Sequence, residues 1–255
     1  MRPHKKFLAL ISLVILFGST CYAATIAGTV KGPDGAPFEG AFVQAQNTKT
    51  RMWFIVLTDS QGRYRVDKVP AGEYNVSTKV TGFRSDPKPG VALAADQDAS
   101  VDFTLQKANI RWNELSIYQL KQLVPASTGK DTLFAQCFVC HGFQTRMASV
   151  RRDADGWQDR IQYMRDAMHF SLSWRFDDKK AADVASFLNS SFGTDATVPR
   201  SPADLPEYKN TTRKFSSDAL NIVYVEYEMP GPSRMLARVA IFRVIAAPHM
   251  AACAA

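Results

Sequence analysis

The segment Cys137-Phe138-Val139-Cys140-His141 constrains the fold of this chain more than any other feature. Two thiols three positions apart on one helical turn can reach the two vinyl groups of a single haem, and the histidine that follows can ligate its iron. The segment therefore predicts one covalently attached haem c. In this interpretation Cys137 and Cys140 form the thioether bonds, and His141 is the proximal iron ligand.

Three other interpretations of the motif compete with haem attachment. A structural zinc site needs four ligands, and the usable ones beyond the motif are His169, His249 and Cys253, the last two in an atypical tail. A thioredoxin-like dithiol needs a strand before the motif, whereas the preceding residues have a helical pattern. A disulfide across two residues would be strained and would leave His141 without a role. Haem attachment uses all three side chains.

The residues on either side of the motif predict two helices. A short helix over 129–136 leads into the motif. A second helix, capped by Asp177 or Asp178, runs to about Ser190, with Gly193 just beyond its end. Apolar residues recur on this second helix at i, i+3, i+4 and i+7, at Ala181, Val184, Ala185 and Leu188.

These flanking segments resemble parts of cytochrome c. Residues 129–136 are similar to its glycine–aromatic N-terminal helix, in which a small residue permits close helix crossing. Residues 157–164 resemble the tryptophan–methionine helix of several small bacterial cytochrome c domains. The resemblance implies that residues 127–195 form a small all-α cytochrome c domain. Within it, Arg160 and Trp157 are candidate haem contacts.

The sequence leaves the ligand on the other side of the iron open. Four residues at steps of four, three and four share one helix face: Trp157, Ile161, Met164 and Met168. Methionines on such a stripe usually pack in a core, but a thioether sulfur is also a good ligand for haem iron. Met164 is the first choice and Met168 the second, with His169 and Met147 as weaker alternatives.

A cluster of arginines surrounds this region, at Arg146, Arg151, Arg152 and Arg160. A solvated surface is one interpretation. The other is that one or two of them neutralise haem propionates while the rest attract an acidic redox partner.

Residues 24–106 have the pattern of a small antiparallel β-sandwich. Six runs rich in β-branched and aromatic residues are candidate strands, at 25–30, 41–46, 52–58, 64–66, 74–80 and 100–105. Proline and glycine clusters separate them, at 33–35, 59–62, 70–72 and 87–90. Strands at this spacing indicate two packed sheets.

The order of these signals is similar to the carboxypeptidase regulatory-like domain, a transthyretin-like (prealbumin-like) sandwich. The likeness rests on Ile26–Val30, Asp34–Pro37, Gly40–Val43, Thr58–Tyr64, Pro70–Tyr74 and Gly82-Phe83. It implies a non-catalytic accessory module, sometimes grouped with carbohydrate-binding folds. A polysaccharide would contact exposed aromatic residues such as Trp53 or Tyr64, although strand aromatics more often belong to a core.

Residues 1–23 predict a secretory signal peptide. A basic start precedes an apolar run from Phe7 to Phe17, which is shorter than the ~20 residues that span a bilayer. Small residues then lead to a cleavage site near Ala23/Ala24. The mature protein is expected in the bacterial periplasm or outside the cell, attached to a membrane only if the signal is not cleaved.

The net charge gives little information about partners. The formal charge is +7, and loss of residues 1–23 leaves 28 basic and 24 acidic residues, or +4. This mild excess does not indicate a nucleic-acid partner.

The C-terminal stretch resembles the start of a further domain. Residues 196–236 begin with a proline-rich segment and contain a candidate strand at 221–228. They resemble the lead-in to a β-propeller of the streptogramin B lyase-like type, but no blade repeat follows. Residues 237–255 fit neither a blade nor a helix pattern, so the sequence suggests a truncated or frameshifted form of a longer protein.

The predicted protein is an exported single-haem cytochrome that transfers electrons. It has no catalytic constellation beyond the haem site and is not expected to be an enzyme. One alternative is the electron outlet of a periplasmic oxidoreductase or lyase-like protein, and another is a carbohydrate-binding surface module. The predicted segments are a signal (1–23), a β-sandwich (24–106), a linker (107–126), a cytochrome c domain (127–195), a propeller lead-in (196–236) and a tail (237–255).

Overall fold

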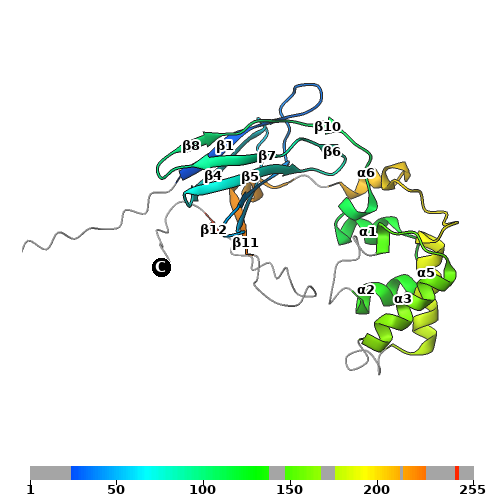
Figure 1. Cartoon of the computed structure of the whole chain (residues 1–255). Helices are drawn as coiled ribbons and strands as arrows, with labels where there is room; N and C mark the ends of the chain where they lie inside the picture. Colours follow the sequence, from blue (N-terminus) through cyan, green and yellow to red (C-terminus); the bar gives the residue numbers. More distant parts are fainter. Residues whose placement is uncertain (1–23, 138–146, 168–175, 213–214, 228–244, 247–255) are drawn as a thin grey trace, which may run out of the picture.

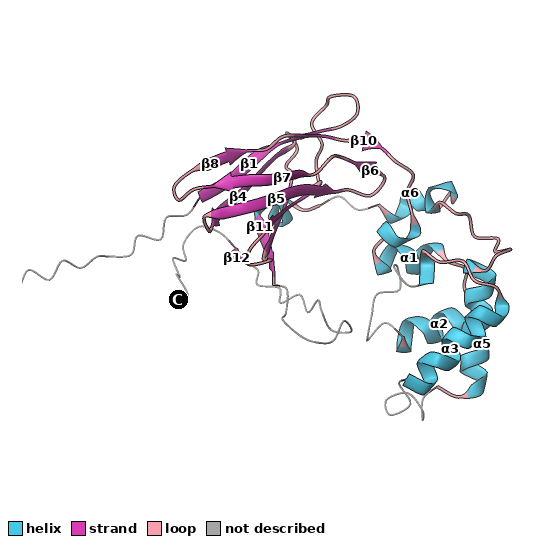
Figure 2. Cartoon of the chain, viewed as in Figure 1, coloured by secondary structure: helices cyan, strands magenta, loops and turns pink. Residues whose placement is uncertain are grey.

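The protein has an N-terminal β-sheet domain and a region of helices that follows it in the chain (Figures 1 and 2). The computed structural model describes residues 24–137, 147–167, 176–212, 215–227 and 245–246. The combination of a β-sheet domain with a helical region agrees with the fold class predicted from the sequence.

The strands of the β-sheet domain form two main sheets. One contains β4 and β8 on either side of β1, with β9 also paired to β1, and the other has the order β12-β11-β3-β2-β5-β7. A two-stranded ribbon joins β6 to β10. The strand bounds are β1 Ala24–Lys31, β2 Phe42–Asn47, β3 Trp53–Leu57, β4 Arg63–Val69, β5 Gly72–Lys79, β6 Phe83–Arg84, β7 Lys88–Leu93, β8 Asp98–Ser100, β9 Phe103–Thr104, β10 Gln106–Lys107, β11 Ile222–Glu226 and β12 Ile245–Ala246.

Alternating side chains form the core of this domain. Along β4, Tyr64 and Val66 are buried while the residues between and beside them face solvent, as expected for a strand with one wet face. On β5, Tyr74 and Val76 are both fully buried. The five predicted strands between 25 and 80 are confirmed as β1 to β5, whereas the run predicted at 100–105 is divided between β8 and β9.

The helices begin at polar capping residues. Ser116 and Gln119 form a capping box at the start of α1, and the Ser127 hydroxyl accepts a hydrogen bond from the Lys130 amide at the start of α2. Asp177, one of the two predicted caps, accepts from the Lys180 amide at 2.8 Å. The helical elements are η1 Trp112–Glu114, α1 Ile117–Leu123, α2 Thr128–Gln136, α3 Ala154–Ala167, α5 Asp178–Phe192, η3 Pro202–Asp204, α6 Tyr208–Thr211 and η4 Ser217–Asn221.

Residues 107–126, predicted as a linker, instead contribute to the helical core. This core, called the helical core below, contains Trp112, Leu115, Leu120, Leu123, Val124, Leu133, Met147, Ala148, Trp157, Ile161, Phe176, Ala181, Val184, Ala185, Phe187, Leu188, Phe192 and Val198. Trp112 meets Phe192 edge to face at a centroid distance of 5.8 Å. Its indole N–H donates to the Pro199 carbonyl at 2.8 Å, so the buried polar atom is satisfied.

The segment predicted as a propeller lead-in is divided between the two parts of the protein. Within it, η3 and α6 lie with the helices, and α6 contacts α1. The candidate strand at 221–228 is present as β11, but it pairs antiparallel with β3, with Val225 opposite Phe54. It therefore extends the N-terminal sheet, and the described residues contain no propeller blade.

The place of Trp112 in the core can be tested by truncation. Trp112→Ala should destabilise the helical region by about 3–5 kcal/mol, because it empties a large buried volume and breaks the bond to Pro199. Ile117→Ala, which alters an exposed apolar side chain nearby, should stay within about 0.5 kcal/mol of the unmodified protein. Urea unfolding followed by helical circular dichroism measures both, and equal effects would show that residues 107–126 behave as a linker.

Candidate functional site

The first cysteine of the C-x-x-C-H motif lies at the C-terminal end of α2. Cys137 is the residue just beyond the helix, and its amide donates to the Leu133 carbonyl at 2.9 Å. Its side chain is half-buried and packs against the helical core, as does Phe134. Cys140 and His141 lie outside the described residues, so Cys137 is the one member of the motif that the structure places.

The helix that carries Cys137 crosses α5 at very short range. A Cβ atom built on Gly129 would lie 2.0 Å from the Asp183 carbonyl oxygen and 2.8 Å from the Cβ of Phe187. Contact at these distances is excluded for any side chain, so the crossing requires glycine. The resemblance of residues 129–136 to the N-terminal helix of cytochrome c implied such a crossing.

The predicted distal face lies on α3, and its residues differ in burial. Trp157 is fully buried, and its indole N–H donates to the Phe192 carbonyl at 3.3 Å. Ile161 is also in the helical core, while Met164 is half-buried and is not among the described side chains that pack on that core. Trp157 is thus a core residue, and its contact with a haem stays a prediction.

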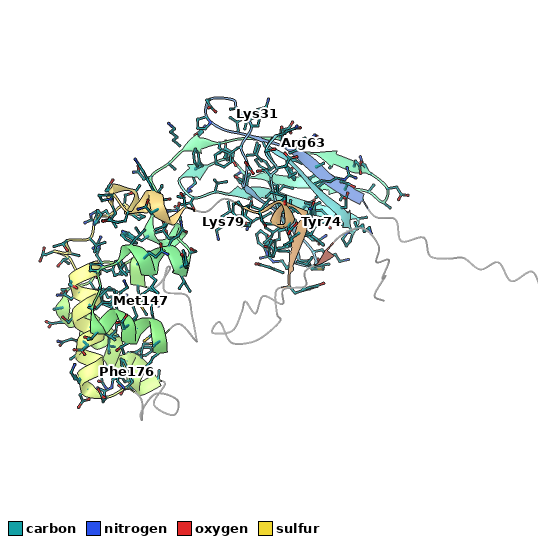
Figure 3. The ribbon with its side chains drawn as sticks, turned by 180° about the vertical axis from the view of Figure 1, so that it is seen from behind. Lys31, Arg63, Tyr74, Lys79, Met147 and Phe176 are labelled. Carbon is teal, nitrogen blue, oxygen red and sulfur yellow. The ribbon has the colours of Figure 1, made fainter. Side chains whose placement is uncertain are left out.

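The other distal candidates are placed as follows. Met147 is buried within the helical core, among the helices (Figure 3). Met168 and His169 lie outside the described residues. Of the two candidates that the structure places, Met164 has the more accessible side chain, and the choice between them as distal ligand stays a prediction.

The predicted arginine cluster separates into residues with different environments. Arg151 donates to three main-chain carbonyls: that of Ser191 at 3.1 Å, in the last turn of α5, that of Gly193 at 3.4 Å, just beyond the helix, and that of Val198 at 3.2 Å, in the segment that follows. Burial and the nearby Arg200 charge lower the pKa of its guanidinium. Arg151 thus bonds the C-terminal end of α5, where carbonyls lack helical partners, and joins it to the segment that follows.

Two of the remaining arginines, Arg152 and Arg160, lie over aromatic rings. The Arg152 guanidinium carbon is 5.6 Å from the centre of the Trp157 ring, and its buried Nε has no hydrogen-bond partner among the described residues. Arg160 is exposed and lies 5.2 Å from the centre of the Tyr163 ring. Arg146 lies outside the described residues. The predicted haem contact of Arg160 therefore stays a prediction.

The two aromatic residues proposed for sugar binding are both strand residues with neighbours on the sheet. Tyr64 is buried, and its hydroxyl donates to the Val101 carbonyl at 2.6 Å. Burial and the Asp102 charge both raise the pKa of Tyr64, so it stays a neutral donor. Trp53 is half-buried on β3, between Gln46 of β2 and Glu226 of β11. Tyr64 is therefore part of the core and cannot present its ring to a ligand.

Two general features of the described residues complete the description of the site. No three histidine, cysteine, aspartate or glutamate side chains within the described ranges gather as a metal site would need. None of the described helices combines the length and the apolar character needed to cross a bilayer.

Comparison with known protein families identifies the N-terminal domain. Residues 25–106 match the model of the carboxypeptidase regulatory-like domain. This part of the chain is therefore a carboxypeptidase regulatory-like domain, as its turn and strand pattern suggests. The match ends at residue 106, so it gives no information about the helical region. A comparison with the curated proteins gave no match.

Several solved structures are similar to part of the chain. The minor pilin GBS52 of Streptococcus agalactiae is 16% identical, covers 34% of this chain and 45% of its own, and has a TM-score of 0.30. The major pilin subunit BcpA of Bacillus cereus is 12% identical, with 34% and 30% covered and a TM-score of 0.29. The Bacillus anthracis TIE protein is 16% identical, with 34% and 17% covered and a TM-score of 0.29. The chain thus spans less than half the length of each, and likenesses at this level carry no functional inference.

The crossing of α2 and α5 can be tested at Gly129. Gly129→Ala should cost roughly 1–3 kcal/mol, because the added methyl group forces the two backbones apart. The matched change Gly156→Ala, on α3, meets mainly the Asp153 side chain and should stay within about 1 kcal/mol of the unmodified protein. Thermal unfolding of both variants measures the difference, and equal stability would refute the close crossing.

The role of Arg151 can be separated from that of a surface arginine. Arg151→Gln should destabilise the protein by about 1.5–3 kcal/mol, because the Ser191 and Val198 carbonyls lose a charged donor. The same substitution at the exposed Arg160 should change the free energy of unfolding by less than about 0.5 kcal/mol. Denaturant unfolding of the two variants provides the comparison. A neutral Arg151→Gln would mean that water replaces the guanidinium at these carbonyls.

Proposed function

We propose that the chain is an exported single-haem c-type cytochrome that transfers electrons, with the transthyretin-like carboxypeptidase regulatory-like domain as its accessory module. The observation that carries the proposal is the C-x-x-C-H motif, which begins immediately after α2, at the half-buried Cys137. The helical region around it would be a cytochrome c domain.

The described residues fit a covalently attached haem at this place. Cys137 has a half-buried thiol next to an apolar core, and its helix is held against α5 by the crossing at Gly129. A large apolar cofactor needs such a surface, because packing its ring against the protein removes water from the ring and from the apolar side chains. Cys137 and Cys140 would hold the haem by thioether bonds, and His141 would ligate the iron.

The chemistry of the bound haem would be one-electron exchange between Fe(II) and Fe(III). The chain's own residues would hold the group and limit the access of water. Met164 is proposed as the distal ligand, with Met168 as the second choice, because a thioether ligand favours the reduced iron. The half-buried position of Met164 on the face of α3 that includes Trp157 and Ile161 supports this order.

The proposed partner is an acidic redox protein in the periplasm or outside the cell. The ammonium nitrogen of Lys121, on α1, lies 5.7 Å from the centre of the Phe134 ring. Phe134 belongs to α2, one turn before Cys137. Positive charge over the helix that leads into the motif would attract an acidic partner and speed association. The signal-like segment 1–23 supports export with cleavage near Ala23/Ala24.

The other functions considered from the sequence have less support. Tyr64 is no longer a candidate for sugar binding by the N-terminal domain, because its side chain is part of the core. The proposal of a lyase-like protein rested in part on the strand that now pairs with β3. Electron transfer therefore remains the function with the most support.

Haem attachment is tested by expressing the chain in cells with active cytochrome c maturation. The purified protein should stain for haem after denaturation and give a reduced low-spin spectrum, because thioether bonds survive denaturation. A double Cys137→Ser, Cys140→Ser variant should lose the stain. A colourless product from cells that mature a control cytochrome normally would refute the proposal.

The distal ligand is tested by comparing Met164→Ala with Met168→Ala. Met164→Ala should lose the methionine-to-iron charge-transfer band, lower the reduction potential and bind carbon monoxide, because removal of the thioether opens a coordination position. Met168→Ala should keep the band and exclude carbon monoxide. The reverse result would assign Met168, and a band that survives both changes would exclude both residues.

A further inference from the structure

The carboxylate of Glu114 lies at the junction between the β-sheet domain and the helical region. It belongs to η1, at the start of the helical region, and its side chain is only 12% exposed. Three donors converge on it. Arg111 Nε donates to Oε1 at 2.7 Å, the Gly82 amide donates to Oε2 at 3.2 Å, and Arg84 of β6 also donates to Oε1. Two of these three donors come from the β-sheet domain.

The backbone around Gly82 fits closely against the helical side of this junction. Gly82 has φ +76°, and a Cβ atom there would lie 2.8 Å from Cγ1 of Ile110, which packs on the helical core. The Gly82 carbonyl accepts from the Ala108 amide at 2.9 Å. A positive φ and a close neighbour both favour glycine, so the turn after β5 is shaped to meet residues 108–114.

A second connection joins the two parts further along the chain. Phe215 meets Phe42 of β2 edge to face at 5.8 Å, η4 contacts β3, and β11 then pairs with β3. The helical region therefore lies between two strands of the β-sheet domain in the chain, β10 and β11, and is attached at both of its ends. Glu114 joins the two parts near the first of these attachments, at the start of the helical region.

We propose that Glu114 is an ionic latch that holds the helical region in one orientation on the β-sheet domain. Its carboxylate separates two guanidinium groups, and it accepts hydrogen bonds from both sides of the junction. Loss of the negative charge leaves Arg84 and Arg111 facing each other without a counter-charge, which favours separation of the two parts.

The electrostatic environment keeps this latch charged at neutral pH. Burial acts to raise the pKa of Glu114, but hydrogen bonds from Arg111, Arg84 and the Gly82 amide outweigh it and lower the pKa below its ordinary value. The charge of Glu114 also affects Tyr208 of α6: burial and the Glu114 carboxylate both raise the pKa of the Tyr208 hydroxyl. This inference does not depend on the proposed haem.

The test is Glu114→Gln in the full chain, with Glu207→Gln as the control. Glu207 is exposed and its side chain makes no capping hydrogen bond, so the control removes the same charge without removing a hydrogen bond to Arg84, Arg111 or Gly82. Amide hydrogen exchange of Ala108, whose N–H bonds to Gly82, should become at least tenfold faster in Glu114→Gln and stay unchanged in the control. Exchange at Leu120 in α1 should be the same in all three proteins.

Two results would overturn the proposal. One is an Ala108 exchange rate in Glu114→Gln equal to that of Glu207→Gln. The other concerns a second variant, which is needed if Glu114→Gln unfolds, as judged by fast exchange at Leu120. That variant is Arg84→Gln, which removes the same ion pair from the sheet side at a more exposed residue. Faster exchange at Ala108 with a protected Leu120 would support the latch, and unchanged exchange at Ala108 would overturn it.

Discussion

The crossing of α2 and α5 at Gly129 is the contact on which the candidate site depends. A Cβ atom on Gly129 would overlap the Asp183 carbonyl oxygen at 2.0 Å, so the two backbones can approach this closely only at glycine. Both helices are held by polar contacts at their ends, with Ser127 capping α2 and Asp177 and Arg151 bonding the two ends of α5. Cys137, at the end of α2, therefore has a fixed place beside the helical core.

Much of the fold could be predicted from the sequence because its signals are local. Strands β1 to β5 alternate or cluster β-branched residues between proline and glycine turns, and each signal lies within a few residues of the element that it marks. The same holds for α5, which has its cap at Asp177, an apolar stripe and Gly193 just beyond its end. At the site, the helical pattern before the motif predicted α2, and the resemblance of residues 129–136 to the N-terminal helix of cytochrome c implied a close crossing at its glycine.

The elements that sequence patterns missed depend on contacts between distant residues. Trp112 meets Phe192 and Pro199, about eighty residues later, so nothing near it in the sequence marks it as core. Strand β11 follows β3 by well over a hundred residues, and its pattern fits any partner strand equally well. Arg151 is one of four clustered arginines, and only the folded chain shows that it bonds the end of α5. Local periodicity specifies the type of an element but not its partner.

The two attachments of the helical region change how the N-terminal domain is to be understood. A module joined by one flexible linker would leave the helices free to turn, whereas β10 and β11 fix both ends and Glu114 joins the parts near the first. Orientation matters for the proposed electron transfer, because a partner must reach one particular face of the helical region. The β-sheet domain would then act on that function by fixing which face is presented, without contributing a residue to the site itself.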